Sequence, residues 1–195
     1  MDDNLTISIG HFSMASNFLH LVSNILMETV NQGNVHQLWT TPRSDIDKFY
    51  EEQTKWSDFR IMTPTLFLFF HGIELVLKGA NYKIGNPKKK PSHNLASLFD
   101  EFKENYPLQH KLIAALDKYI YPTATNCPLI YNFNHSNNFD NSSNFYEALK
   151  YPYSKGLEKC YQHTEIRFLN DAGIPAYSDI VQDIFMIRAE IANIK

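Results

Sequence analysis

The sequence predicts an all-α fold, with about five or six helices and one long Asn-rich loop in a single domain over residues 1–195. Hydrophobic residues make up 44% of the chain and aromatic residues 14%, which is enough to bury a sizeable core. Apolar residues recur at intervals of three and four along several stretches, as in helices that bury one face. No internal repeat or second composition regime divides the chain, and a net charge of −3 gives no overall attraction for nucleic acid.

The first two helices are predicted from their apolar faces and from residues that begin or end a helix. Over residues 11–32 the apolar positions share one face, and Gly33 then ends the helix. A loop is expected over 34–44, and Asp45 is placed to cap a second helix at about 46–57. The apolar positions that define the two faces are Phe12, Ala15, Leu19, Val22, Leu26 and Val30, then Ile46, Phe49, Tyr50 and Trp56.

Residues 60–80 are apolar on every side, as expected of a central, buried helix. Pro64 favours a first turn or a kink, so we expect the regular helix to begin there. Gly79 or a residue near it should end the helix. Residues 81–91 contain Gly, two Pro and four Lys, and we expect them to form an exposed basic loop.

The second half of the chain contains three more predicted helices. Ser92 caps one over 93–105, Pro107 opens one that runs to about 120, and the last covers about 177–193, with Ser178 or Asp179 near its start. Residues 122–145 contain seven Asn and two Pro and are predicted to form a long loop, which is either functional or mobile or reflects a bias toward Asn. Residues 157–169 fit neither the helical nor the strand period.

The chain carries no sign of export or of membrane insertion. Its first ten residues contain two acids and no Lys or Arg, the wrong charge for a secretory signal. The longest apolar run, residues 66–70, is far shorter than the roughly 18 residues of a membrane span. We therefore expect a soluble, cytoplasmic protein in which Cys127 and Cys160 stay reduced.

The central helix contains a polar island. His71, Glu74 and Lys78 are spaced by three and four residues and therefore share one face. Because burying a charge without a partner is costly, Glu74 must be satisfied, either by Lys78 at the helix edge or by a residue of another helix. His93 is the expected partner, since it opens the next helix, where an imidazolium is unfavourable unless a carboxylate faces it. The Glu74–His93 contact would serve as a conformational clamp or as an acid/base pair.

These residues resemble a known family. Residues 74–78 (ELVLK), a Lys-bearing Gly/Pro loop and residues 93–98 (HNLASL) resemble the ELxLK…HxLxxL block of HEPN-like helical domains. Residues 145–152 (FYEALKYP) are similar to the RYP block of that superfamily, with Lys150 where Arg is usual and Tyr151 next to it. The resemblance covers roughly residues 60–155. It implies a bundle of four or five helices that commonly dimerises, found in prokaryotic toxin, anti-phage and RNA-processing systems.

Many HEPN proteins are metal-independent ribonucleases with an Arg-x4–6-His motif in a late helix. This sequence departs from that pattern, because no Arg is followed by a His at that spacing, and His163 and Arg167 stand in the reverse order. We therefore assign no catalytic residue. The resemblance implies a non-catalytic or degenerate module whose polar cluster is Glu74, Lys78, His93, Lys150 and Tyr151.

A basic rim is predicted beside this cluster, made of Lys83, Lys88, Lys89 and Lys90. These lysines either keep a turn soluble or attract RNA phosphate or a nucleotide to the start of the helix at residue 93. Tyr82, Tyr151 and Tyr153 either stack on bases or cover the edge of the core.

Three functions stay open at this stage. The first is binding of RNA, a nucleotide or a partner protein in a defence or stress system. The second is a metal-independent ribonuclease that uses His93, Glu74 and a lysine, and the third is a structural dimerisation module. The eight His and two Cys lack the spacing of a metal site, so no metal or cofactor is expected. A homodimer is expected, with its interface on the first or last helix.

Overall fold

The computed structural model describes residues 3–36, 44–85 and 92–194 and is mostly helical, at 72%. These residues contain no strand, and Tyr153 and Cys160 form an isolated antiparallel β-bridge. The prediction of an all-α fold is thus confirmed. The helices are α1 (Asp3–Gln32), α2 (Ile46–Thr54), α3 (Asp58–Lys83), α4 (Leu95–Asn105), α5 (His110–Ile120), α6 (Pro128–Asn137), α7 (Ser142–Ala148) and α8 (Ile174–Ile191), with the 3₁₀ helices η1 (His163–Ile166) and η2 (Asn170–Gly173) before α8.

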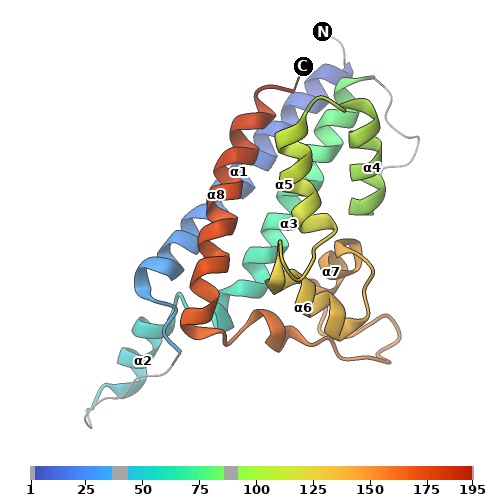
Figure 1. Ribbon diagram of the computed structural model, residues 1–195. Helices are drawn as coiled ribbons and strands as arrows, with labels where there is room; N and C mark the ends of the chain where they lie inside the picture. Colours follow the sequence, from blue (N-terminus) through green and yellow to red (C-terminus); the bar gives the residue numbers. More distant parts are fainter. Residues whose placement is uncertain (1–2, 37–43, 86–91, 195) are drawn as a thin grey trace.

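The three longest helices, α1, α3 and α8, run side by side through the length of the molecule (Figure 1). Helix α1 runs antiparallel to the other two, and both chain ends lie at the same end of the bundle (Figure 1). Helices α4 and α5 pack near that end, whereas α6 and α7 lie beside the other half of α3. The loop before α8 passes close to the start of α3, so segments far apart in the sequence meet there.

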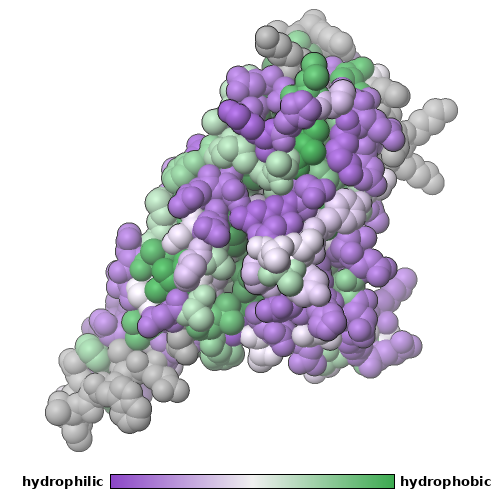
Figure 2. Space-filling model, viewed as in Figure 1, coloured by the Kyte–Doolittle hydropathy of each residue, from purple (hydrophilic) through white to green (hydrophobic). Residues whose placement is uncertain are grey.

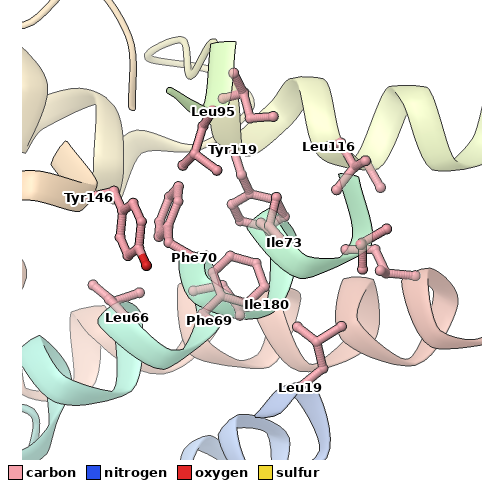
Figure 3. Packing of buried hydrophobic residues seen from close by; sticks show 14 of the residues in the cluster. Leu19, Leu66, Phe69, Phe70, Ile73, Leu95, Leu116, Tyr119, Tyr146 and Ile180 are labelled. Atoms are coloured by element: carbon pink, nitrogen blue, oxygen red, sulfur yellow. The ribbon is translucent and has the colours of Figure 1, made fainter. Parts of the chain in front are cut away.

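The core is built around α3, as its apolar sequence predicts. Phe69, Phe70 and Ile73 of α3 are fully buried, and Phe69 meets Tyr119 of α5 edge-on with ring centroids 4.7 Å apart. Figure 3 shows these side chains between Leu19 of α1 and the α5 side of the bundle. Helix α1 approaches α3 closely enough that a Cβ at Gly79 would lie 2.9 Å from the Phe12 ring. A small residue is therefore needed at this crossing.

The expected bounds of the central helix were wrong at both ends. Helix α3 begins at Asp58, so Pro64 lies inside the helix and does not start it. The N–H that Pro64 lacks costs one backbone hydrogen bond near the first turns, and burial of the neighbouring Met62 and Leu66 side chains offsets that cost. The helix also continues through Gly79 to Lys83, because the glycine packs against α1 and does not end the helix.

The prediction of a long loop over 122–145 was also wrong. Much of this stretch folds into α6 and α7, which is why the bundle has more helices than the five or six expected. Phe133 of α6 and Phe145 of α7 are fully buried, with ring centroids 4.8 Å apart. The asparagines that suggested a loop include helix ends: Asn138 ends α6 with a left-handed φ of 57°, and Asn141 caps α7 by accepting from the Ser143 N–H at 2.9 Å.

Several other boundaries differ, by eight residues at the start of α1 and by a few residues elsewhere. Helix α1 begins at Asp3, and α8 begins at Ile174 with a proline in its first turn. Asn94, not Ser92, caps α4, since its side chain accepts from the Ser97 N–H at 2.9 Å. Helix α2 ends at Thr54, and the Asp45 side chain makes no capping hydrogen bond. The ambiguous stretch 157–169 contains the β-bridge at Cys160 and η1.

One helical stretch of the described chain, Ile46–Lys83, is long and apolar enough to cross a membrane by length and composition. In the structure, 61% of its most apolar window is buried against other helices. The core helix of a bundle meets the same test, so this finding does not identify a span.

The packing of α6 can be tested with Phe133→Ala. The variant should lose about 3–5 kcal/mol of unfolding free energy, because it removes a fully buried ring that packs on Phe145. Asn132→Ala, at an exposed position of the same helix, should change stability by less than about 0.5 kcal/mol. Urea denaturation measures both. Similar, small losses would mean that residues 122–145 form a loop after all.

Candidate functional site

The predicted contact between Glu74 and His93 is present. Glu74 lies on α3 with only 2% of its side chain exposed, and its Oε1 is 2.8 Å from His93 Nδ1. Lys78, one helical turn further on, donates to the same oxygen at 2.6 Å. Glu74 therefore makes both predicted contacts at once, one with Lys78 of its own helix and one with His93 just before α4.

The other carboxylate oxygen of Glu74 faces α7. Tyr146 donates its hydroxyl to Oε2 at 3.0 Å, and His71 Nδ1 lies 3.4 Å from that oxygen and 3.0 Å from the tyrosine hydroxyl. Figure 3 shows the Tyr146 ring beside Phe70 and above Leu66, with its hydroxyl directed toward α3. We call these residues, Glu74, Lys78, His93, His71 and Tyr146, the Glu74 cluster.

The Glu74 cluster holds its carboxylate in the ionised form. Burial alone would raise the pKa of Glu74, but hydrogen bonds from His71, Lys78 and His93 and the charge of Lys78 outweigh it and lower the pKa from 4.5 to about 2. Burial, together with the Glu74 charge, raises the pKa of the Tyr146 hydroxyl, so that it stays protonated and donates. A general acid or base needs a pKa near the working pH. The geometry therefore favours a clamp that joins α3, α4 and α7.

Lys150 and Tyr151 take a different position from the one expected. The Lys150 ammonium lies 4.3 Å from the centroid of the Tyr146 ring and pairs with Glu147 at 2.7 Å. Tyr146 thus stands between Lys150 and Glu74. Lys150 and Tyr151, which is 60% exposed, line an open cleft next to the Glu74 cluster.

The basic rim can be placed only in part. Lys83 donates to the backbone carbonyl of Ile194 at 2.6 Å and so ties the end of α3 to the C-terminal segment. Lys88, Lys89 and Lys90 lie outside the described residues.

The cleft beside Lys150 is rich in cations. It lies between the start of α3 and the segments that follow α7 and η1, and has a volume of about 280 Å³. None of the described residues that line it is acidic. We call it the cationic cleft. Its lining is Phe59, Arg60, Thr63, Leu149, Lys150, Tyr151, Pro152, His163 and Arg167.

Two guanidinium groups of the cationic cleft are held by aromatic rings. Arg60 lies over the Phe59 ring at 5.1 Å, and Arg167 lies over the Phe168 ring at 5.4 Å. The two phenylalanine rings stack on each other with centroids 5.5 Å apart and an angle of 8°. Arg167 also donates to the Phe59 carbonyl. Cation–π contact orients a guanidinium without neutralising its charge, so both groups remain able to attract an anion.

A second buried carboxylate, Asp58, supports this stack. It occupies the first turn of α3, where negative charge is favourable, and is fully buried. Its oxygens accept from the backbone N–H groups of Phe168 and Leu169 at 2.8 and 2.9 Å. Phe168 has a left-handed φ of 61°, which costs a non-glycine residue on the order of 1–3 kcal/mol. The two hydrogen bonds hold this conformation and with it the position of Arg167.

Three side chains complete what we call the Asp58 cluster. Asn34 donates to Asp58 Oδ2 at 3.0 Å and accepts from the Asp58 N–H at 2.7 Å, and His36 Nε2 lies 2.7 Å from Oδ1. Tyr177 of α8 donates to Oδ2 at 2.7 Å, and burial together with the Asp58 charge raises its pKa, so the hydroxyl stays protonated. The cluster joins the end of α1, the start of α3, the segment after η1 and α8.

The sequence pattern does not point to Asp58, to Arg60 or to the position of His163 in the cationic cleft. An acid directly after Ser57 marks a helix start, which would have placed the first turn of α3 correctly. Nothing in the local pattern shows that Asp58 is buried or that Arg60 meets Arg167, because these contacts join residues about a hundred positions apart in the chain.

No metal centre is found in the part of the chain that the structure describes: no three His, Cys, Asp or Glu side chains come together there in a way that could hold an ion. Both cysteines are free, and burial raises the pKa of the Cys127 thiol to about 11. In comparisons with known proteins, no family model, curated protein or solved structure matches the chain. The resemblance to HEPN-like domains thus stays a prediction.

The Glu74 cluster predicts a loss of stability in acid. Because the native pKa of Glu74 is lowered from 4.5 to about 2, its contribution is fully present above about pH 5 and is lost as the pH falls toward 2. The amount is on the order of 3 kcal/mol. Urea unfolding of the wild type and Glu74→Gln across this range should show a shallower pH dependence for the variant, whereas the exposed Glu104→Gln should follow the wild type. Equal slopes for all three would contradict the lowered pKa.

Proposed function

We propose that the protein binds single-stranded RNA through the cationic cleft. The observation that carries this proposal is the meeting of Arg60, Lys150 and Arg167 with His163 in one open cleft. Arginine suits phosphate because its planar fork of donors matches two phosphate oxygens. The net charge of −3 limits attraction to this local patch.

Lys150 is available to such a ligand despite its carboxylate partner. Its pair with Glu147 lies at the surface, where the Glu147 side chain is 53% exposed. Surface pairs contribute little, about 0–1 kcal/mol, so a phosphate can replace Glu147 at small cost.

A shallower hollow extends the cleft along α3. Its lining, Thr63, Pro64, Phe67, Leu149 and Lys150, shares three residues with the cleft. Phe67 stacks on Tyr146 with centroids 5.5 Å apart, which links this hollow to the Glu74 cluster. A surface that alternates cations with aromatic rings suits a single strand, whose phosphates and bases are both accessible.

We also propose that the chain is a divergent HEPN-like domain acting in the cytoplasm in a defence or stress system. Two observations support the assignment: the helical bundle itself, and the contact of Glu74 with His93, the residues that begin its two resembling motifs.

The RNA proposal predicts salt-sensitive binding that depends on Arg60 and Lys150. Arg60→Gln and Lys150→Gln should each weaken binding of a labelled oligouridylate about tenfold, or ~1.4 kcal/mol. Each should also make the slope of log affinity against log salt shallower by about 0.7, the value for one lost phosphate contact on a single strand. Fluorescence anisotropy at several salt concentrations measures both quantities.

The matched control is Lys111→Gln, which removes a cation that is 78% exposed on α5 and does not line the cleft. Its affinity should equal that of the wild type, and thermal unfolding should show that all variants remain folded. If the wild type fails to bind, or all three variants weaken equally, the cleft is not the site.

A metal-independent ribonuclease is the second candidate, favoured by the presence of His163 beside Arg167 in the cleft. A guanidinium can stabilise a phosphorane-like charge, and an imidazole can move a proton. The same RNA, incubated with the protein in EDTA, separates the two functions. Cleavage that His163→Ala abolishes would show the enzyme, and cleavage that only His93→Ala abolishes would place it at the Glu74 cluster. Intact RNA in all samples supports binding alone.

We propose a homodimer through the outer face of α1. Ile7, Met14 and Leu21 are 41%, 52% and 46% exposed and are spaced by seven residues, so they share one helix face. Figure 2 shows apolar surface over α1 and α8 at the left of a largely hydrophilic view. Light scattering should report two 22.7 kDa chains for the wild type and one for Met14→Glu, with Asn31→Glu still dimeric. A monomeric wild type would exclude this interface.

A further inference from the structure

A hollow of about 730 Å³ adjoins the cationic cleft on the far side of Tyr151. It is formed by residues 147–161, where the chain leaves α7 and turns back on itself. Tyr151, Tyr153 and Leu157 are 60%, 47% and 77% exposed, which is unusual for large apolar side chains gathered in one place. With Pro152 and Tyr161 they make up what we call the tyrosine hollow.

The wall of the tyrosine hollow is held in place by backbone hydrogen bonds. The Ser154 N–H donates to the Lys159 carbonyl at 2.8 Å, and the Tyr161 N–H donates to the Pro152 carbonyl at 2.9 Å. Lys159 anchors the turn to α6 by donating to the Asn137 carbonyl at 2.6 Å. The hollow is therefore already formed in the free protein, and a ligand would not have to order it.

Leu157 lies on this wall in a strained backbone conformation. Its φ of 62° lies in the left-handed region, where a non-glycine residue loses stability, and its side chain is largely in water. An asparagine would suit the backbone better. Strain of this kind persists at ligand-binding positions, where the side chain gains a contact once the ligand is bound.

The hollow and the cleft are continuous. Tyr151 and Pro152 line both, so a ligand that crosses Tyr151 has one end among cations and the other among apolar side chains. The hollow is also lined by one acid, Glu147, and one base, Lys155. Its lining therefore does not select strongly for a positively or a negatively charged ligand. The ligand that fits this arrangement carries an anionic group next to a flat, largely apolar one.

We propose that the tyrosine hollow binds the base of one nucleotide whose phosphate lies in the cationic cleft. Tyr151, Tyr153 and Tyr161 supply rings on which any base can stack, and Leu157 covers the base from the turn. Because the base must leave its neighbours to enter the hollow, the site accepts unpaired RNA and excludes a duplex. This inference rests on the proposed RNA binding and adds the part of the nucleotide that is recognised.

The test compares an oligouridylate with an abasic ribose-phosphate oligomer of the same length and charge. The wild type should bind the base-bearing oligomer about tenfold more tightly, within the range for stacking of one base. Tyr153→Ala should lower its affinity to that of the abasic oligomer, while Tyr153→Phe, which keeps the ring, should bind like the wild type. None of these variants should change binding of the abasic oligomer.

A second variant distinguishes the loss of a ligand contact from disruption of the turn that carries it. Leu157→Asn suits a left-handed residue, so it should leave thermal stability unchanged or raise it, and it should still weaken binding of the base-bearing oligomer. Equal wild-type affinity for both oligomers, with salt-dependent binding intact, overturns the base-binding inference alone. Binding of neither oligomer overturns the proposed function. Tight binding of a duplex of the same length would also count against the hollow as a base site.

Discussion

The interaction on which the arrangement most depends is the set of hydrogen bonds to the buried Asp58 carboxylate. Its two oxygens receive two side-chain donors, Asn34 and Tyr177, two backbone N–H groups and the close approach of His36. These groups come from three separate stretches of the chain, and Asp58 itself belongs to a fourth. A buried charge with this many partners is stable only if all of them are in place. The start of α3, the end of α1 and the segment before α8 are thus fixed together.

The two buried carboxylates of α3 position different parts of the molecule. Asp58 holds the backbone of Phe168, and through it the stack that presents Arg167 to the cationic cleft. Glu74 joins α4 and α7 to α3, and its partner Tyr146 lies under Lys150. Arg167 and Lys150 are therefore each positioned by a network whose acidic centre is buried. This arrangement keeps positive charge at the surface of a protein that is negative overall.

Local patterns were enough to predict part of this molecule. The buried α3 and the contact of Glu74 with His93 follow from short spacings and from the cost of burying charge. Prediction from local patterns failed where one residue type occurs in two kinds of structure. Asn138 and Asn141 suggested a loop, although asparagine also ends and caps helices, as it does around α6 and α7. The cationic cleft was beyond prediction because Arg60 and Arg167 meet only through the tertiary fold.

Asp58 and Glu74 lie on the same helix, so the helix sets the distance between their two clusters. Asp58 and Glu74 are sixteen positions apart on the helix, which sets them roughly 24 Å apart along the axis. Helix α3 is buried along most of its length, and the Asp58 and Glu74 clusters share no residue. Groups so far apart without shared partners contribute additively to stability. Substitutions around His93 should therefore leave the Asp58 cluster unchanged and the reverse should hold as well, whereas the cationic cleft depends on both carboxylates, because Lys150 packs on Tyr146 of the Glu74 cluster.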